Sequence, residues 1–474
     1  MKRAECVSWG RLAMKLDRIP VRDQDPKVRI NNFKEVCLGY DADEAVHEAE
    51  RCLQCKNPKC VSACPVAINI PKFIKELREG DLKASRDTLG DASNLPAVCG
   101  RVCPQEEQCE GKCIVGIRGE AVNIGKLERY VADWALETEY RNIEKNAPNG
   151  KKVAVVGSGP AGLTCAGDLA KMGYDVTIFE ALHEPGGVLV YGIPEFRLPK
   201  EKVVKEEIRL LLDLGVKIET NVIVGRTITI DSLIEDENFE GIFIGSGAGL
   251  PKFMGLKGEN ANGVMSANEY LTRANLMKAF RLDYDTPISH GLKVVVVGAG
   301  NVAMDSARTA IRLGAEARIV YRRSEKEIPA RIEEVHHAKE EGVIFSLLTN
   351  PKEILVDERG FVKGMICVRM TLGEPDESGR RRPIEEKGTE FVIDCDTIIM
   401  SLGTSPNPLI ASTTKGIETN PKGCIIINEN SGETSLHGIF AGGDVVTGSA
   451  TVILAMSAGK KAATGIDAFI QGEN

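Results

Sequence analysis

Cysteine residues near the amino end carry the clearest chemical signal in this chain. Eight of its 14 cysteines fall between residues 52 and 113 in two runs, Cys52, Cys55, Cys60 and Cys64-Pro65, then Cys99, Cys103-Pro104, Cys109 and Cys113. A Cys-x-x-Cys motif followed by a further Cys and by Cys-Pro is typical of ferredoxins, in which thiolates bind a cubic iron–sulfur cluster. We therefore expect this region to bind iron–sulfur clusters and to transfer single electrons.

Two other uses of cysteine fit this pattern less well. A disulfide framework requires an oxidising compartment, and residues 1–10 show neither the apolar core nor the cleavage site of an export signal. A structural zinc site would account for the Cys-x-x-Cys motif, but the second run has Cys-x3-Cys-x5-Cys-x3-Cys spacing, which no common zinc ribbon has. The other cysteines are scattered, and we interpret them as small buried side chains: Cys6, Cys37, Cys165, Cys367, Cys395 and Cys424.

A glycine-rich segment after residue 150 has the pattern of a nucleotide-binding turn. An apolar strand at 151–156 leads into Gly157-Ser-Gly159-Pro160-Ala161-Gly162, and a helix is expected over 163–172. The first glycine permits a tight turn, the second lets a pyrophosphate approach the backbone, and the third allows close packing of helix on strand. The start of the helix offers free N–H groups to the phosphates. A second strand at 175–179 ends at Glu180, where a ribose diol needs a hydrogen-bond acceptor.

The same unit recurs at residues 293–303, where an apolar strand leads into Gly298-Ala-Gly300-Asn301-Val302-Ala303. Its next strand, at 317–321, ends in Arg322 and Arg323 instead of an acid. Guanidinium groups form charge-assisted bonds to a 2′-phosphate, whereas a ribose hydroxyl needs a carboxylate. We therefore expect this second site to bind NADP(H) in preference to NAD(H). A solvated strand end is the alternative for the two arginines.

A third segment, near the carboxyl end, combines a strand, two glycines and an acid. A buried-strand pattern at 438–441 ends in Gly442-Gly443-Asp444, and helical spacing follows at 450–459. The segment is similar to one in two-dinucleotide flavoproteins, whose Asp contacts the ribityl chain of FAD and whose next helix points its positive end at the flavin. This resemblance implies that Asp444, with Gly443, Thr451 and Val452, completes the site begun at Gly157.

These motifs require several domains to position them. A length of 474 residues exceeds what one core usually supports and predicts about three domains. We predict an α/β protein with a helical iron–sulfur domain at 1–145, followed by two Rossmann-like dinucleotide-binding domains. The FAD-binding domain is split into 146–287 and 399–474, and the NADP(H)-binding domain is inserted at 288–398. We interpret the segments 241–249 and 397–403 as the crossings between them.

Composition excludes several classes of partner. The chain has 60 basic and 68 acidic residues, a net charge of −8 and no long basic tract, which argues against binding nucleic acid or a membrane surface. No apolar run approaches the roughly 20 residues needed to cross a bilayer. A thiol-rich chain without an export signal is expected to be cytoplasmic.

Taken in order, these motifs resemble those of the NADPH-dependent glutamate synthase small-subunit family over almost the whole chain. The resemblance is carried by the two cysteine runs and by Gly186-Gly187-Val-Leu-Val-Tyr-Gly-Ile-Pro-Glu-Phe-Arg197-Leu-Pro199. It implies two [4Fe–4S] clusters in a helical domain, on a glutathione-reductase-type core that binds FAD, with Gly187 at the FAD, and NADPH. Within the family, the chain is most similar to the large subunit of NADH-dependent ferredoxin:NADP oxidoreductase, an electron-bifurcating enzyme also described in archaea as sulfide dehydrogenase.

The resemblance also implies the ligands of the clusters. One cluster takes Cys52, Cys55, Cys60 and Cys113, and the other takes Cys64, Cys103 and Cys109. For the eighth ligand, the similar domain of dihydropyrimidine dehydrogenase uses a glutamine where this chain has Glu128, so we favour Glu128. Cys99 is the alternative, and an exposed helix acid is a third interpretation of Glu128. A carboxylate ligand would alter the potential of the cluster.

Two further sets of charged residues have alternative interpretations. The resemblance places Arg197 in a flavin-side loop, where it could act as the catalytic residue by stabilising a reduced, anionic flavin. A structural salt bridge is the alternative for Arg197. Lys56 and Lys59 are interleaved with cluster ligands and could contact an acidic ferredoxin, or they could be solvated loop lysines.

These residues predict an oxidoreductase that passes electrons from NADPH to FAD, then to the clusters and a partner. A disulfide reductase would carry a Cys pair after the FAD glycines, whereas Cys165 stands alone there. The main hypothesis is the large subunit of a bifurcating transhydrogenase, a hetero-oligomer that couples NADPH, ferredoxin and, through a smaller flavoprotein and iron–sulfur subunit, NAD(H). The alternative is the electron-supplying small subunit of glutamate synthase. Such a subunit could not make glutamate alone, because the chain lacks the catalytic cysteine and the large domains of the synthase. Two intact nucleotide sites disfavour a third hypothesis, a non-enzymatic carrier or scaffold.

Overall fold

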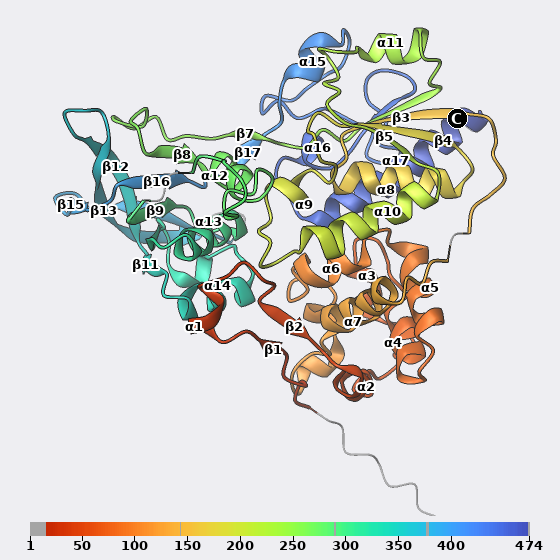
Figure 1. Ribbon diagram of the computed structural model, residues 1–474, viewed down its shortest axis with the longest axis horizontal. Coiled ribbons are helices and arrows are strands. Elements are labelled where there is room, and N and C mark those ends of the chain that lie inside the picture. The colour runs from red at the N-terminus through yellow and green to blue at the C-terminus, as the bar shows by residue number, and fades with distance from the viewer. Residues whose placement is uncertain (1–15, 143, 289–290, 376–378, 473–474) are drawn as a thin grey trace, which may run out of the picture.

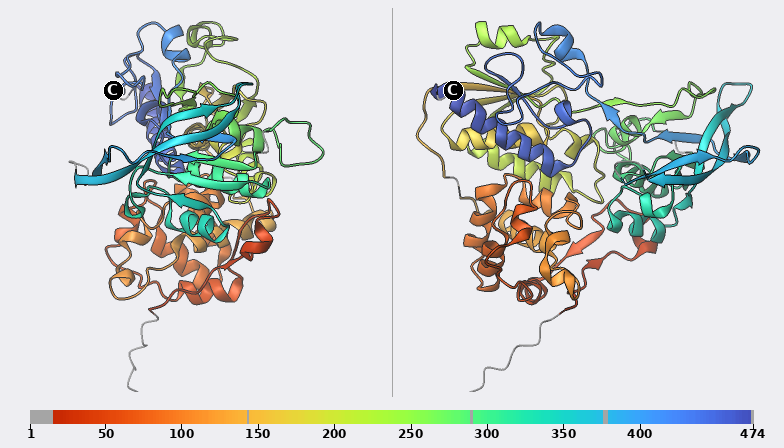
Figure 2. Two further views of the ribbon diagram at one scale, coloured as in Figure 1. Left: turned by 90° about the vertical axis from the view of Figure 1, so that its left-hand side faces the viewer. Right: turned by 180° about the vertical axis from the view of Figure 1, so that it is seen from behind.

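The computed structural model describes residues 16–142, 144–288, 291–375 and 379–472. Figure 1 shows a helical part near the amino end and two parts built around parallel sheets. The helical part lies against the helices of the first sheet part, and its amino-terminal segment reaches across to the second (Figure 2). The predicted α/β fold, with a helical amino-terminal domain and Rossmann-type domains, is therefore confirmed. Cys6 lies outside the described residues.

The helical part is built from short amphipathic helices. Asp41 and Glu44 form a capping box at the start of the first of them, which satisfies N–H groups that have no partner within the helix. In a later helix Phe73, Ile74 and Leu77 are buried together, because their spacing places them on one face. The helices are α2 (Ala42–Ala49), α3 (Lys59–Ser62), α4 (Ile70–Arg78), α5 (Leu82–Ala92), α6 (Pro96–Val102) and α7 (Ile124–Glu137), with 3₁₀ turns η1 (Glu110–Lys112) and η2 (Ile114–Ile117).

The first sheet contains the first glycine turn and has the strand order β18-β6-β3-β4-β5, with all pairs parallel. Its strands are β3 (Lys152–Val156), β4 (Asp175–Phe179), β5 (Lys217–Glu219), β6 (Gly241–Ile244) and β18 (Ile439–Ala441). The face toward the helical part is covered by α8 (Pro160–Lys171), α10 (Lys205–Asp213) and α17 (Val452–Gln471) (Figure 1). The other face packs against α11 (Ile230–Glu235) and α15 (Leu409–Thr413). Both faces are covered, which explains why β3, β6 and β18 are almost wholly apolar, whereas the edge strand β5 carries two charged residues.

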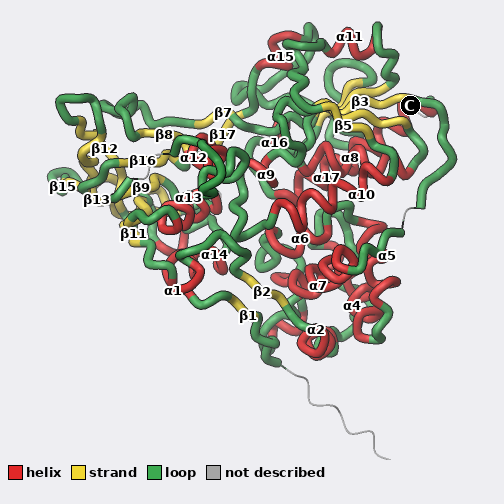
Figure 3. The backbone as a smooth tube through the Cα atoms, viewed as in Figure 1, coloured by secondary structure: helices red, strands yellow, loops and turns green. Residues whose placement is uncertain are grey.

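The second sheet contains the second glycine turn and has the order β11-β10-β9-β16-β8, again parallel. Its strands are β8 (Val264–Ser266), β9 (Lys293–Val297), β10 (Glu316–Val320), β11 (Ile344–Ser346) and β16 (Thr397–Met400). One face packs against α12 (Ala267–Ala274), α13 (Asn301–Arg312) and α14 (Ile332–Glu340). Antiparallel strands β12 (Thr349–Val356), β13 (Val362–Pro375) and β15 (Phe391–Ile393) gather at the far end of this part (Figure 3) and share its second apolar core. Strand β14 (Arg381–Glu385) pairs with β13 and is largely exposed.

The chain crosses between the two sheets at β7 (Leu250–Pro251) and β17 (Thr404–Ser405), which pair with each other in antiparallel fashion. The predicted boundaries at 287/288 and 398/399 therefore need correction, since β8, α12 and the whole of β16 belong to the second sheet part. The reason is that β8 is a short edge strand placed by pairing with β16, Val264 opposite Ile398. It carries no glycine turn of its own that a sequence pattern could detect.

An amino-terminal strap links the helical part to the second sheet part. It comprises β1 (Arg22–Asp23), α1 (Pro26–Arg29) and β2 (Cys37–Gly39), of which the strands pair in antiparallel fashion. Figure 1 shows α1 lying beside α14. None of the helices in the described parts of the chain is long and apolar enough to cross a membrane.

Candidate functional site

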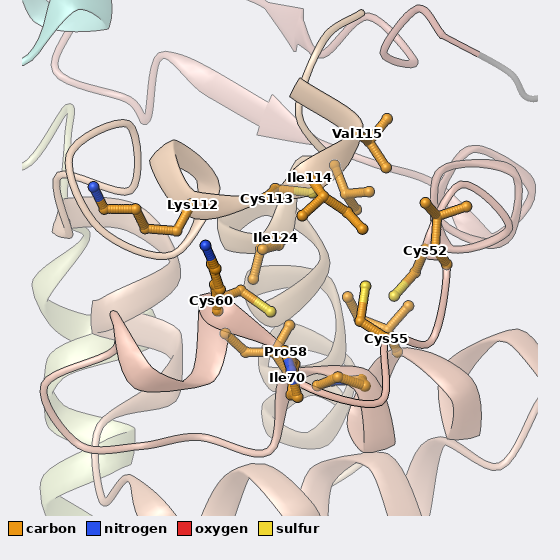
Figure 4. Close-up of a pocket in the computed structure, with 15 residues that line it drawn as sticks. Cys52, Cys55, Pro58, Cys60, Ile70, Lys112, Cys113, Ile114, Val115 and Ile124 are labelled. Carbon is orange, nitrogen blue, oxygen red and sulfur yellow. The ribbon is translucent and has the colours of Figure 1, made fainter. Parts of the chain in front are cut away.

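Four cysteines of the helical part line one cavity, and we call them the outer set (Figure 4). Cys52 and Cys55 lie in the loop after α2, Cys60 lies on α3, and Cys113 directly follows η1. The sulfur atoms of the first three face the space between them (Figure 4). This space amounts to about 400 Å³, part of it open to solvent. The structure therefore gathers the four residues that the resemblance assigns to one cluster.

The thiols of the outer set perturb one another. Burial, together with the nearby Cys52 and Cys113, raises the pKa of Cys60 to about 11. Gln54 has left-handed backbone, with φ of 49°, and its side-chain amide donates to the Cys52 sulfur at 3.4 Å. Hydrogen bonds to ligand sulfurs tune the potential of iron–sulfur clusters. No sequence motif marks Gln54, because its amide reaches the Cys52 sulfur only through the left-handed turn that Gln54 adopts.

A second group, the inner set, comprises Cys64, Cys103, Cys109 and Glu128. Burial raises the pKa of Cys64 to about 11, and Glu128 and Cys103 contribute through their charges. Burial also raises the pKa of Cys109, to which Glu128, Cys103 and Cys64 contribute as well. These mutual effects show that the four side chains lie together. Cys103 and Cys109 are only 7% and 9% exposed, whereas Cys64 and all four cysteines of the outer set are half-buried.

Glu128 has the features of a ligand rather than of an exposed acid. It is 6% exposed, and its Oε1 atom has no hydrogen-bond partner among the described residues. Leaving such an atom unpaired costs about 1–3 kcal/mol. Burial raises the pKa of Glu128 well above its usual range, and Cys103 adds to the effect. Helices α6 and α7 approach so closely that a Cβ on Gly100 would lie 2.7 Å from the Arg129 nitrogen, which brings Cys103 to Glu128.

Cys99, the alternative ligand, has other partners. Its Sγ lies 3.4 Å from Sδ of Met456 in α17. A hydrogen bond with Cys103 and burial raise the pKa of Cys99 well above its usual range. Cys99 therefore joins the inner set to the first sheet part. Across the described ranges, no three His, Cys, Asp or Glu side chains are grouped closely enough to hold a single metal ion.

The first glycine turn lies between β3 and α8, where the sequence predicts it. A Cβ on Gly162 would lie 1.9 Å from the Gly157 carbonyl oxygen, so only glycine allows α8 to pack this closely. Gly187 lies against the same turn, because a Cβ there would be 2.9 Å from Cα of Gly159. The Ser158 hydroxyl accepts a hydrogen bond of 2.9 Å from the Gly186 amide. The loop at 186–187 therefore closes one side of the turn.

The start of α17 completes this side of the first sheet. Gly443 lies so close to α8 that a Cβ on it would be 3.0 Å from Cβ of Ala161, the residue after Pro160. Thr451 caps α17, accepting a hydrogen bond from the Leu454 amide at 3.4 Å, and Val452 is the first residue of the helix. The structure thus brings the last predicted segment to the first glycine turn.

Two acids, Glu180 and Asp444, are brought to the first glycine turn although they are far apart in the sequence. The Glu180 carboxylate accepts hydrogen bonds from the amides of Ser158 at 2.9 Å and Leu182 at 2.8 Å. Burial raises the pKa of Asp444. Burial, followed by the charges of Asp444 and Glu180, raises the pKa of Tyr191 to about 12. The charges of both acids therefore act on Tyr191, a residue that no sequence motif marks.

The second glycine turn is equally tight. Gly298 has φ of 128°, and a Cβ on it would lie 2.3 Å from the Ser401 carbonyl oxygen. Gly300 precedes α13, whose first residue, Asn301, accepts a hydrogen bond of 3.0 Å from the Arg331 amide. Val302 is 44% exposed and Ala303 is fully buried. This turn can receive a pyrophosphate at the start of α13 in the same way as the first.

The two arginines after β10 are available to an anion. The Arg323 Nε donates to the Arg381 carbonyl oxygen at 2.9 Å, so β14 holds the base of its guanidinium. Within the described ranges, the terminal nitrogens of Arg323 have no protein partner, and Arg322 is exposed. This arrangement leaves donors free for a 2′-phosphate.

Arg197 has protein partners that the sequence could not reveal. Its Nη1 lies 2.8 and 2.7 Å from the carboxylate oxygens of Asp305 in α13, and its Nε lies 2.9 Å from Glu334 in α14. Burial opposes the charge, but Asp305 and Glu334 outweigh burial and raise the pKa of the guanidinium. The structure thus supports the alternative of a structural salt bridge, one that joins the two sheet parts.

Helix α14 connects the second sheet part to the helical part through buried charges. Arg29 of the strap donates to Glu341 at 2.8 Å, and Lys126 of α7 donates to Glu333 at 2.8 Å. The Arg331 Nη1 donates to the Arg101 carbonyl oxygen at 2.8 Å. No sequence motif marks these residues, because their partners come from distant parts of the chain.

Comparison with protein families covers nearly the whole chain in two matches. Residues 29–140 match the family described as dihydropyrimidine dehydrogenase domain II, 4Fe-4S cluster. Residues 145–459 match the family of pyridine nucleotide-disulphide oxidoreductases. These matches identify a flavin and iron–sulfur oxidoreductase that uses NAD(P)H.

Over the aligned residues, curated relatives are more than a third identical to this chain. The glutamate synthase [NADPH] small chain of Escherichia coli is 38% identical over 459 residues, covering 95% of this chain and 97% of that protein. The NADP(+)-dependent formate dehydrogenase subunit beta of Moorella thermoacetica is 39% identical over 437 residues, or 87% of this chain and 60% of that protein. The NADPH-Fe(3+) oxidoreductase subunit beta of Geobacter sulfurreducens is 35% identical over 481 residues, or 96% and 69%.

Solved structures show the same fold at low identity. FprA of Mycobacterium tuberculosis in complex with NADPH has a TM-score of 0.56 at 18% identity, covering 68% of this chain and 85% of that chain. A 2-naphthoyl-CoA reductase has a TM-score of 0.51 at 18% identity, covering 84% of this chain and 49% of that chain.

Proposed function

This chain belongs to the family of NADPH-dependent glutamate synthase small chains, and on that premise we propose that it is the electron-supplying subunit of a hetero-oligomeric glutamate synthase. The observation that carries the proposal is the arrangement of its sites. Two nucleotide turns lie on neighbouring sheets, and the outer set lies at the surface. Helix α6, which ends just before Cys103 of the inner set, contacts α17 through Cys99. This order suits electrons that enter at the second glycine turn and leave at the outer set.

The residues of the first sheet part can hold FAD. The turn at 157–162 and the start of α8 offer N–H groups to a pyrophosphate, while Glu180 keeps acceptor capacity for a ribose, since a carboxylate can accept about four hydrogen bonds. Asp444 and the start of α17 lie on the other side of the same site. These residues would hold FAD, and the bound flavin would supply the exchange between the two-electron chemistry of NADPH and single-electron transfer.

We propose two [4Fe–4S] clusters, held by the outer set and by the inner set. The outer set supplies Cys52, Cys55, Cys60 and Cys113, which surround one cavity. In the inner set, the unpaired Oε1 of Glu128 supports this carboxylate as the eighth ligand over Cys99. Cys99 instead contacts Met456, so it helps to place the inner set beside the FAD-binding part.

The second sheet part is proposed to bind NADPH at the turn 298–303 and at Arg322 and Arg323. The free guanidinium nitrogens support the choice of a 2′-phosphate. The salt bridges of Arg197 to Asp305 and Glu334 fix the second sheet part against the first, so Arg197 is assigned a positioning role.

Of the two functions weighed from the sequence, the relatives support the electron-supplying subunit better than the bifurcating transhydrogenase. Relatives whose names describe subunits of formate dehydrogenase and of an Fe(3+) oxidoreductase indicate that one module serves several partners. A ferredoxin or an NAD(H)-binding subunit therefore stays a prediction, and a glutamate synthase large chain is the partner proposed.

The test uses the full chain prepared anaerobically, compared with Cys64→Ala and with Cys395→Ala, a buried cysteine of the second sheet part. The unaltered protein should contain about eight irons, and NADPH should bleach both its flavin and its iron–sulfur absorbance. With a purified large chain it should support NADPH-dependent glutamate formation. Cys64→Ala should keep flavin bleaching but lose glutamate formation, while Cys395→Ala keeps both. Glutamate formation that persists in Cys64→Ala would overturn the proposed route.

A further inference from the structure

Exposed apolar side chains surround the outer set. Leu53 is 46% exposed, Ile114 is 41% exposed and Ile117 is 81% exposed. Leu53 and Ile114 line the same cavity as the four thiols, and Figure 4 shows Ile114 beside Cys113 at its edge. An apolar patch with a polar border is typical of a surface that binds another molecule. We call these three residues the apolar rim.

Four cations border the apolar rim. Lys59 and Lys112 line the cavity, Lys56 lies three residues before Lys59, and Arg118 directly follows Ile117 of the apolar rim; all four are exposed. Within the described residues, none of the four forms an ion pair or a side-chain hydrogen bond. The chain as a whole carries a net charge of −8, so this concentration of free positive charge is a local feature.

The acids nearest Lys112 and Arg118 in the sequence differ in their partners. Glu110 is paired with the Arg18 guanidinium, whose Nη2 donates to it at 2.7 Å. Glu120 accepts a hydrogen bond of 2.8 Å from the Arg18 amide and keeps its charge, so it offsets part of the positive charge of Arg118. Lys59 and Lys112, which line the cavity itself, have no ion-pair partner among the described residues.

We infer that the apolar rim and its four cations form the docking surface for an acidic, electron-accepting protein. The inference rests on the proposed function and specifies the chemistry of the partner surface. Positive charge around the outer set would steer an acidic face onto it and set its orientation. The apolar rim would exclude water at the centre of the contact.

Binding to an acidic plant-type ferredoxin, used as a probe without NADPH, tests this surface. The unaltered chain is compared with a fourfold variant, Lys56→Gln, Lys59→Gln, Lys112→Gln and Arg118→Gln. A matched control replaces four exposed lysines of the sheet parts, Lys202, Lys252, Lys415 and Lys422, by Gln. The rim variant should weaken binding about tenfold and flatten its dependence on salt, whereas the control should change it less than about twofold. Ile117→Ser should speed dissociation.

Two results would overturn the inference. One is equal binding by the rim variant and the control, and the other is tighter binding of basic cytochrome c than of the acidic ferredoxin. A negatively charged membrane is the other possible partner, and it is tested by comparing binding to anionic and to neutral lipid vesicles. If the rim variant loses binding to anionic vesicles but keeps binding to ferredoxin, the surface would be assigned to a membrane instead. Flavin bleaching by NADPH, measured on every variant, separates this failure from failure of the proposed function, because the docking surface does not contribute to bleaching.

Discussion

Replacing Glu341 by glutamine should detach the second sheet part from the strap more effectively than any change at its surface. Glu341 is 4% exposed and lies among three arginines. Arg29 Nε donates to it at 2.8 Å, Arg308 donates at 2.9 and 2.8 Å, and Arg312 donates at 2.6 and 3.1 Å. Glutamine keeps the shape of the side chain but removes the charge that these three cations share.

The structure sets the size of the effect. Removing one partner of a buried ion pair costs about 3–5 kcal/mol, and Glu334 and Glu340 still balance part of the positive charge. We therefore expect Glu341→Gln to lower the free energy of unfolding by about 4 kcal/mol. Glu340→Gln is the matched control, because the Glu340 side chain is 50% exposed and, among the described residues, pairs with Arg29 alone. Arg29 itself is buried but keeps its bond to Glu341 in this variant, and water screens the exposed Glu340, so the control should lose less than about 1 kcal/mol.

The same network makes a prediction about pH. Burial alone would raise the pKa of Glu341, but Arg308 and Arg312 hold it below its usual range. A carboxyl group with a lowered pKa in the folded state stabilises the protein above its usual pKa, and the effect is lost as pH falls toward the lower value. Glu341→Gln should therefore show a weaker loss of stability on acidification than the unaltered chain.

The assay is urea unfolding of the three proteins, followed by far-ultraviolet circular dichroism, with limited proteolysis of the strap as a local measure. Faster cleavage between residues 16 and 40 is expected in Glu341→Gln and not in Glu340→Gln. Equal losses in the two variants, or a loss below about 1 kcal/mol in Glu341→Gln, would show that this buried network does not hold the parts together.

Two further predictions concern the cofactor sites, and a third concerns a buried acid of α10. Arg323→Ala should raise KM for NADPH by about 10- to 150-fold through loss of a charge-assisted bond and leave KM for NADH unchanged, as flavin bleaching would report. Lys326→Gln, which removes the same charge three residues later, should leave both KM values unchanged, and an equal effect of Arg323→Ala on both coenzymes would contradict the assignment. Glu128→Ala should reduce iron from about eight to about four per chain while Cys99→Ala keeps it, and the reverse result would make Cys99 the ligand. Burial raises the pKa of Glu207 from its usual 4.5 to about 7, so the folded state favours the protonated form. The free energy of unfolding should therefore fall by about 3 kcal/mol as pH rises from about 4.5 to about 7. A Glu207→Gln variant that showed the same fall in urea unfolding would refute this explanation.

Much of the fold could be predicted from the sequence because its signals are local. Gly162 and Gly298 mark turns where a side chain would collide with a neighbouring carbonyl, and such a requirement shows directly in the residue type. Strand β4 matches the predicted residues 175–179, since buried parallel strands are continuously apolar. The position of β8 could not be predicted, because an edge strand of three residues is defined by its pairing with β16.

By itself, the sequence determined the two nucleotide turns, the iron–sulfur character of the helical part and the order in which these units follow one another. Spacing within a few residues fixes backbone conformation and thiol separation, so those features needed no knowledge of distant contacts. Only the tertiary structure decided the partners of buried charges: Arg197 pairs with α13 and α14, Arg29 reaches Glu341, and Glu128 is left with an unpaired oxygen beside three thiols. The partner of a charge depends on how whole elements pack, and residues adjacent in sequence carry no record of that packing.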